Sequence, residues 1–185
     1  MTEKTLPKIG CLAWGSLEWD PRTLKVNLPW QHDGPTLPVE YLRQSLKGHL
    51  TLVLAEIGAP VVTLWATMTV ANLSEGVESL RFREGEKLNE KHIGRWPCDK
   101  RYPFAEKIGA WALAKELDAV VWTALPPKFG GIDHRTPTAE EALNHLASLS
   151  GEAAAAAEEY VRLTPLAVRT PFRVLFEKEL GWLPA

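Results

Sequence analysis

Three segments with the pattern of β-strands follow one another between residues 39 and 68, and this run limits the fold more than any other feature. The turns that separate them, Lys47-Gly48 and Gly58-Ala59-Pro60, are too short to hold a helix. Strands joined by such short turns pair antiparallel. We therefore predict an antiparallel meander of three strands, which cover residues 39–45, 49–54 and 61–68.

The alternation of side chains assigns a face to each residue of these strands, because successive side chains point to opposite sides. In the third strand, the face expected to line the core carries Val62, Leu64, Ala66 and Met68. In the first strand, Arg43 and Ser45 lie on the same face. These two residues are candidates for binding a carboxylate, and the alternative is that Arg43 pairs with a surface acid.

Helical patterns flank these strands and fill most of the second half of the chain. The predicted helices cover 75–84, 104–116, 138–149 and 152–162, and a last one begins at Thr170-Pro171. Ser74 is the predicted N-cap of the first helix, and Gly85 is expected to end it. Two further strands are predicted at 9–14 and 119–125, and loops at 18–37 and 86–103. The combination indicates the α+β (mixed α/β) class.

The composition is typical of one globular domain, and we expect residues 1–185 to form it. The formal net charge of -2 gives no electrostatic attraction to nucleic acid. No run of about 20 apolar residues indicates a membrane span, and the N-terminus shows no signal-type apolar core, so we expect a cytoplasmic protein. The two cysteines and five histidines lack the spacing of a metal site, so no metal is expected.

A short apolar segment from Ile9 to Trp14 runs into Gly15-Ser16, which is the pattern of a strand that ends in a sharp bend. Backbone N–H groups in such a bend lack strand partners. Together with the Ser16 hydroxyl they can hold a carboxylate or a carbonyl oxygen. The alternative is a turn that only ends the strand.

Glu84 continues the apolar stripe of the first predicted helix, whose other members are Leu73, Val77 and Leu80. Burial and the negative end of the helix dipole both disfavour a charged carboxylate at this position, which makes it a better proton acceptor. The alternative is a glutamate in a frayed last turn, paired at the surface with Arg81 or Lys87.

The stretch Trp14-Gly15-Ser16-Leu17-Glu18-Trp19-Asp20-Pro21 is followed, after the strands, by Leu80-Arg81-Phe82-Arg83-Glu84-Gly85. In order and spacing, the two resemble the gamma-glutamylcyclotransferase superfamily, especially its ChaC-like branch. That branch opens with Tyr-Gly-Ser-Leu followed by an aromatic residue and a proline, and carries its catalytic glutamate after a helix. Here Trp14 stands in the place of the tyrosine. The segments 34–43 and 122–126 look like segments of uncharacterised bacterial members.

The resemblance implies a curved mixed sheet or small barrel with surrounding helices, in which the bend and Glu84 face one cavity. It implies an enzyme of acyltransferase or lyase type that needs no metal or other cofactor. The free α-amine of a γ-glutamyl group attacks its own side-chain amide and releases 5-oxoproline. Glu84 would be the general acid/base for a small γ-glutamyl amine or peptide. The residues implied to bind this substrate are Trp14, Gly15, Ser16 and Leu17.

Two other functions stay open. A catalytically silent member could use the same cavity to bind a small ligand or serve as an interaction module, because a fold does not guarantee activity. An amide-cleaving hydrolase would use Ser16 or Cys98 as its nucleophile, although the sequence around Ser16 lacks the second glycine of a nucleophile elbow.

Overall fold

The computed structural model describes residues 6–185 and shows a mixed α+β protein with five α-helices in that range. The predicted class is therefore confirmed. The described chain forms two compact units, each built on a sheet of its own. The first unit takes residues up to 13, 20–35 and 63–124, and the second takes 14–19, 36–62 and 125–185. The single domain over 1–185 and the finer family fold stay predictions.

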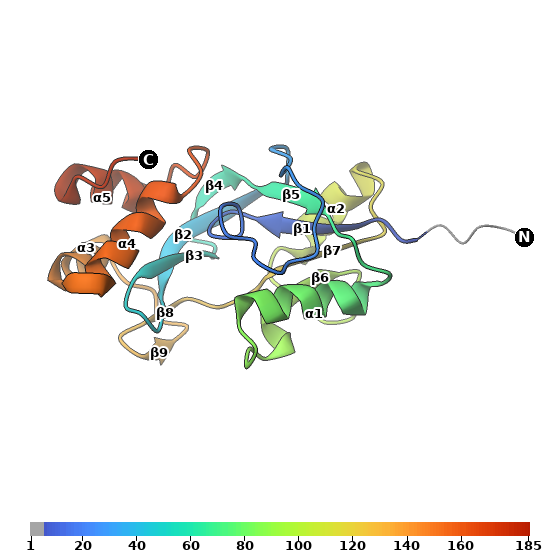
Figure 1. Ribbon diagram of the computed structural model, residues 1–185, viewed down its shortest axis with the longest axis horizontal. Coiled ribbons are helices and arrows are strands. Elements are labelled where there is room, and N and C mark those ends of the chain that lie inside the picture. The colour runs from blue at the N-terminus through green and yellow to red at the C-terminus, as the bar shows by residue number, and fades with distance from the viewer. Residues whose placement is uncertain (1–5) are drawn as a thin grey trace, which may run out of the picture. The chain divides into compact units, whose positions relative to one another are not determined.

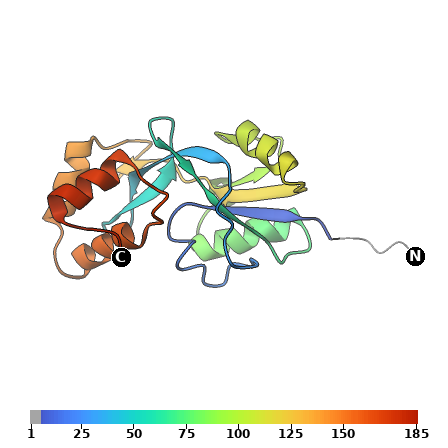
Figure 2. The same ribbon diagram turned by 90° about the horizontal axis from the view of Figure 1, so that it is seen from above.

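The sheet of the first unit has the strand order β5-β1-β7-β6. Its strands are β1 (Ile9–Ala13), β5 (Leu64–Thr67), β6 (Ile93–Trp96) and β7 (Ala119–Thr123). The central strands β1 and β7 run parallel, whereas β5 and β6 pair antiparallel at the edges. The helices are α1 (Leu73–Glu84), α2 (Ala105–Ala114) and the short 3-10 helix η1 (Glu90–His92). Because α1 and α2 lie on opposite sides of the sheet, β1 is buried along its whole length (Figure 1, Figure 2).

The sheet of the second unit is centred on β2 (Thr36–Gln44). Its other strands are β3 (Leu50–Leu54), β4 (Ala59–Val62), β8 (Lys128–Phe129) and β9 (Ile132–Asp133). The order is β3-β2-β8-β9, and β4 also pairs with β2. The last part of the chain forms α3 (Ala139–Ser148), α4 (Gly151–Leu163) and α5 (Pro171–Leu180). These three helices lie together next to β2 and β3 (Figure 1).

The predicted meander is correct for its first two strands and wrong for the third. β2 and β3 pair antiparallel, and the turn between them contains Gly48 in the left-handed region with φ of 94°. The expected third strand over 61–68 is divided between two sheets, because β4 pairs with β2 and β5 pairs with β1. Val62, predicted to line the core, is 45% exposed.

The division falls at Thr63, which is fully buried. Its hydroxyl donates to the carbonyl of Pro35 at 2.8 Å, and its own carbonyl accepts from the N–H of Gly34 at 2.9 Å. A residue whose polar groups are bonded to a neighbouring loop cannot continue a regular strand ladder. The alternation of apolar residues across Thr63 gave no sign of these bonds.

Three short strands were not expected. β6 lies in the segment predicted as the loop 86–103, and β8 and β9 form a small hairpin. In β6, Gly94 lies opposite Trp122 of β7, and a Cβ at Gly94 would stand 2.2 Å from the indole ring. Gly94 therefore leaves room for Trp122. A glycine weakens the pattern of a strand, but the pairing of β6 with β7 requires one at this position.

The predicted helices all exist, and two of them begin at the predicted signals. The capping box at Thr138 and the proline at the first position of α5 are confirmed. The predicted start of α1 is wrong, because Asn72 rather than Ser74 is its N-cap and accepts from the N–H of Glu75 at 3.0 Å. Asparagine and serine cap helices about equally well, so the pattern did not distinguish them.

Glu40 is 3% exposed, and its carboxylate lies between β2 and the start of α5. It accepts hydrogen bonds from the Thr170 hydroxyl at 2.6 Å, the Phe172 N–H at 3.2 Å and the Tyr41 N–H at 2.9 Å. The N-terminus of a helix favours an anion there. Burial nevertheless raises the pKa of Glu40 above its ordinary value, with the three hydrogen bonds opposing the rise.

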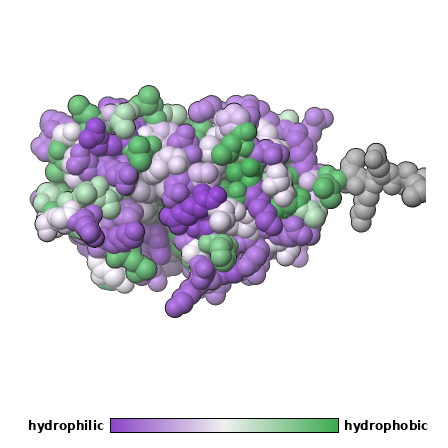
Figure 3. Space-filling view, in the orientation of Figure 1, coloured by the Kyte–Doolittle hydropathy of each residue, from purple (hydrophilic) through white to green (hydrophobic). Residues whose placement is uncertain are grey.

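On the face shown in Figure 3, hydrophobic residues lie in small groups between hydrophilic ones. Among the described residues, no helix has the length and the apolar character needed to cross a lipid bilayer.

We predict that replacing Glu40 with glutamine changes how stability depends on pH. Because the pKa of Glu40 is raised in the folded state, that state binds the proton more tightly than the unfolded chain does. The free energy of unfolding should therefore fall as the pH rises from the unfolded pKa, 4.5, through the folded one. The stability of the native protein relative to Glu40→Gln should decrease over this window. Urea denaturation between pH 4 and 8 measures it, and a difference that grows with pH would contradict it.

Candidate functional site

The last turn of α1 carries two neighbouring charged residues that are both largely buried. The side chain of Arg83 is 5% exposed and that of Glu84 is 16% exposed, and Arg83 Nη1 donates to Glu84 Oε1 at 2.8 Å. Val77 and Leu80, on the same stripe as Glu84, are buried as predicted. Among the described contacts, Glu84 Oε2 has no hydrogen bond.

The Arg83 guanidinium also holds the chain that enters the first unit at residue 20. Its Nε and Nη2 donate to the carbonyl of Asp20 at 3.1 and 2.6 Å, and the Asp20 carboxylate pairs with Arg22 at 2.9 Å. The alternative drawn from the sequence was a surface pair of Glu84 with Arg81 or Lys87. Arg81 pairs instead with Glu78. Adjacent helical side chains do not usually face each other, so the sequence gave no reason to choose Arg83.

The charge of Glu84 acts on β1. Burial raises the pKa of the Cys11 thiol far above its ordinary value, the negative charge of Glu84 raises it further, and Arg83 opposes this. Cys11 is therefore a buried, neutral thiol. The carboxylate of Glu84 thus contributes to the electrostatic environment of β1.

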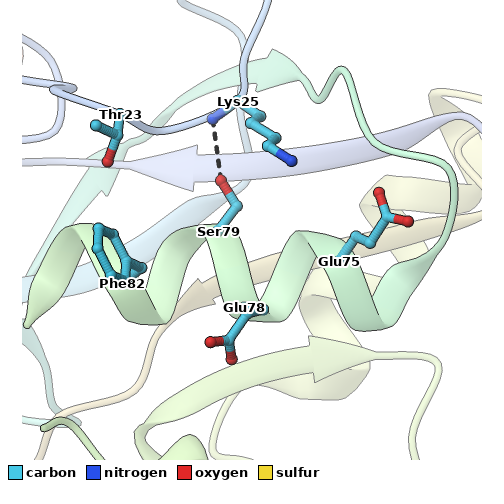
Figure 4. A pocket seen from close by; sticks show the side chains of 6 residues that line it. All are labelled: Thr23, Lys25, Glu75, Glu78, Ser79 and Phe82. Atoms are coloured by element: carbon cyan, nitrogen blue, oxygen red, sulfur yellow. Dashed lines mark hydrogen bonds between the residues drawn. The ribbon is translucent and has the colours of Figure 1, made fainter. Parts of the chain in front are cut away.

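The outer side of α1 borders a separate groove of about 290 Å³. The residues that line it are Thr23, Lys25, Glu75, Glu78, Ser79 and Phe82 (Figure 4). Ser79 Oγ accepts from the Lys25 N–H at 3.0 Å and so ties the loop to the helix. The two carboxylates are already bonded, that of Glu75 to the start of α1 and that of Glu78 to Arg81. The groove therefore offers no pair of carboxylates for acid/base chemistry.

In the second unit, the predicted bend over 14–17 lies against β3. Trp14 Nε1 donates to the carbonyl of Leu52 at 3.3 Å, and the N–H of Glu18 closes the turn on the carbonyl of Gly15 at 2.9 Å. Trp14, Gly15 and Leu17 are buried and Ser16 is half-buried. The expected nest of backbone amides stays a prediction.

Tyr160 of α4 contacts this bend, although no pattern in the sequence indicated it as a site residue. Its hydroxyl accepts from the N–H of Leu52 at 3.3 Å. Its ring packs against Trp19 and His49, with ring centroids 5.3 and 5.4 Å apart. Tyr160 is the one aromatic residue of an otherwise alanine-rich and acidic helix. This single aromatic residue in a helix of small and charged side chains was the feature of the sequence that could have pointed to Tyr160.

Arg43 and Ser45, predicted to share a strand face, have separate partners. The strand predicted over 39–45 ends at Gln44, and a bulge lies between Tyr41 and Arg43. Arg43 Nη1 donates to the carbonyl of Pro126 at 2.8 Å, and burial lowers the pKa of its guanidinium. Ser45 lies in the turn, where its Oγ is 3.0 Å from His49 Nδ1. Ser45 is thus connected through His49 to Tyr160, whereas Arg43 is directed to Pro126.

Ser45 and His49 form a hydroxyl–imidazole pair, which is the first element of a serine nucleophile. Burial and the charge of Lys47 lower the pKa of His49, so its imidazole is neutral near pH 7. The Ser45 N–H also donates to the His49 carbonyl at 2.8 Å. No third side chain in the described contacts holds the ring by a hydrogen bond. The pair is therefore explained by closure of the β2–β3 turn.

Cys98, the other candidate nucleophile, is exposed, and its sulfur accepts from the N–H of Lys100 at 3.4 Å. Within residues 6–185, no group of three or more His, Cys, Asp or Glu side chains has the arrangement of a metal site.

No protein-family model matches this chain, and no curated protein matches it. Glu84 belongs to the first unit and the bend to the second. The shared cavity implied by the resemblance therefore stays a prediction.

We predict that Arg83→Met destabilises the protein by about 3–5 kcal/mol, because it leaves the Glu84 carboxylate buried without its counter-charge. The double variant Arg83→Met/Glu84→Gln should recover part of this loss, since no buried charge is left unpaired. Chemical denaturation measures both.

The control is Arg162→Met, which removes an exposed pair with Glu158 and should cost at most about 1 kcal/mol. If Arg83→Met and Arg162→Met lower the free energy of unfolding by the same amount, the buried pair contributes no more to stability than the exposed one, and the prediction is wrong.

Proposed function

We propose that this protein is a γ-glutamyl cyclotransferase, which releases 5-oxoproline from a small γ-glutamyl amine or peptide with Glu84 as the general acid/base. The proposal rests on the resemblance of the two stretches around Gly15 and Glu84 and on the environment of Glu84 itself.

The observation that carries the proposal is the placement of the Glu84 carboxylate. It is largely buried, Oε1 is held by Arg83, and Oε2 has no hydrogen bond among the described contacts. A general base needs a fixed carboxylate oxygen that is free to accept a proton. Its charge also acts on β1, the strand that leads into the bend. A glutamate paired at the surface would lack this burial.

The reaction needs two proton transfers and no external nucleophile. Glu84 takes one proton from the α-ammonium group of the substrate, and the amine nitrogen then attacks the γ-amide carbonyl carbon. In the resulting tetrahedral intermediate, Glu84 returns the proton to the leaving nitrogen, and the bond from this nitrogen to the carbonyl carbon breaks. The attacking nitrogen loses its second proton to the departing amine, so the products are 5-oxoproline and the protonated amine.

The bend would bind the glutamyl group. Backbone N–H groups of Gly15, Ser16 and Leu17 would hold its oxygen atoms and stabilise the oxyanion of the intermediate. Holding the amine and the amide of one molecule together contributes further, because aligned reacting groups can supply several of the ~7–11 kcal/mol associated with ideal orientation.

We predict that Glu84→Gln lowers the rate of 5-oxoproline release by about 10²–10⁴-fold, because glutamine cannot accept the proton. The assay is a panel of γ-glutamyl amines and γ-glutamyl dipeptides, with 5-oxoproline quantified by mass spectrometry. Glu86→Gln, which changes an exposed acid two residues further on, is the matched control and should keep full activity.

Turnover by Glu84→Gln at the native rate would remove Glu84 from the mechanism. If the native protein binds γ-glutamyl compounds but releases no 5-oxoproline, the proposal fails, and the catalytically silent ligand-binding protein becomes the better description.

A further inference from the structure

Three segments of the second unit meet at the backbone of Leu52. β3 is an edge strand of its sheet, so Leu52 presents polar groups that no neighbouring strand of that sheet covers. Trp14 bonds to its carbonyl, and the Tyr160 hydroxyl accepts from its N–H. Gly15 lies against the same hydroxyl. We call these four residues, Trp14, Gly15, Leu52 and Tyr160, the Leu52 junction.

Gly15 is required in this junction for space and not for backbone conformation. The φ angle of Gly15 is not positive, so an alanine could adopt the same backbone angles. A Cβ at this position, however, would stand 2.7 Å from Tyr160 Oη. The next atoms, Leu52 Cδ1 at 3.6 Å and Tyr160 Cζ at 3.7 Å, are at ordinary contact distance. The single obstacle to a side chain at residue 15 is therefore one hydroxyl oxygen.

Tyr160 cannot easily move away from that position. Its ring is packed edge-on against Trp19 and Tyr41, with centroids 5.3 and 6.2 Å away, and is tilted against His49 at 5.4 Å. Its hydroxyl is fixed by the bond from Leu52. A buried aromatic ring with neighbours on several sides has little freedom to shift without opening a cavity.

We propose that Tyr160 is the positioning residue of the bend: its hydroxyl sets where the backbone of residues 14–17 lies. The effect of Tyr160 on catalysis rests on the proposed function, in which the bend binds the glutamyl group. The contact between Tyr160 and Gly15 does not depend on that function. Its effect on the bend can therefore be tested whether or not the protein is an enzyme.

The test is a double-mutant cycle of Gly15→Ala and Tyr160→Phe. Gly15→Ala should lower the unfolding midpoint and shift the amide resonances of Ser16 and Leu17. Tyr160→Phe removes the obstructing oxygen, so the double variant should unfold later than Gly15→Ala and its Ser16 and Leu17 resonances should return toward the native positions. Coupling of this kind is expected for residues in contact and not for distant, independent sites.

Tyr41→Phe is the matched control, since it removes another buried hydroxyl, bonded to Thr164 at 2.9 Å, from a neighbouring ring. Combined with Gly15→Ala, it should give no rescue. Additive effects of Gly15→Ala and Tyr160→Phe, or equal rescue by Tyr41→Phe, would overturn the proposal.

If the native protein releases 5-oxoproline, Gly15→Ala should lower kcat/KM on the order of 10²-fold, as expected for a misplaced binding group. The double variant should recover most of the lost kcat/KM. In Gly15→Ala, KM should change more than kcat, because the bend binds the substrate. A purely structural role for Tyr160 predicts recovery of the midpoint without recovery of kcat/KM. If the native protein has no such activity, the proposed function fails, and the midpoints and resonances alone decide the role of Tyr160.

Discussion

Backbone groups outside regular strand ladders need hydrogen-bond partners. In this protein, side chains supply these partners at the edge of β3 and near the end of α1. At the open edge of β3, Trp14 and Tyr160 bond the two backbone groups of Leu52. At the end of α1, Arg83 bonds the carbonyl of Asp20. The bend and the chain at Asp20 are each held in a defined position by these bonds. A loop fixed in this way can present backbone N–H groups to a ligand with little loss of entropy.

Two of the largely buried carboxylates, those of Glu40 and Glu84, show how surroundings separate a structural acid from a candidate catalyst. Glu40 accepts hydrogen bonds from β2 and from the start of α5, and both of its oxygens are used. Glu84 is held through one oxygen only, by a neighbouring guanidinium. A carboxylate with every oxygen bonded serves the fold, whereas one with an oxygen left for a ligand can take part in proton transfer. For this reason Glu84, and not Glu40, is the candidate for acid/base chemistry.

Much of the fold was predictable because it depends on local signals. The helices α3 and α5 begin at a capping box and at a proline, signals that act within a few residues. The division of the predicted third strand at Thr63 was not predictable, since it depends on bonds to Gly34 and Pro35 some thirty residues earlier. β6 was missed for the same reason, because Gly94 has a role only when Trp122 lies opposite it.

The candidate site also combines features that depend on local sequence with features that depend on tertiary contacts. The sequence by itself determined that a glycine-containing bend follows the first strand and that Glu84 continues an apolar helical stripe, because both patterns depend on spacing along the chain. Only the tertiary structure decided that Arg83 would be the partner of Glu84 and that Tyr160 would lie against Gly15. Tyr160 lies almost 150 residues from Gly15, and no local propensity records which side chain will fill the space beside a glycine. That choice is made by close packing of segments that meet only when the chain has folded.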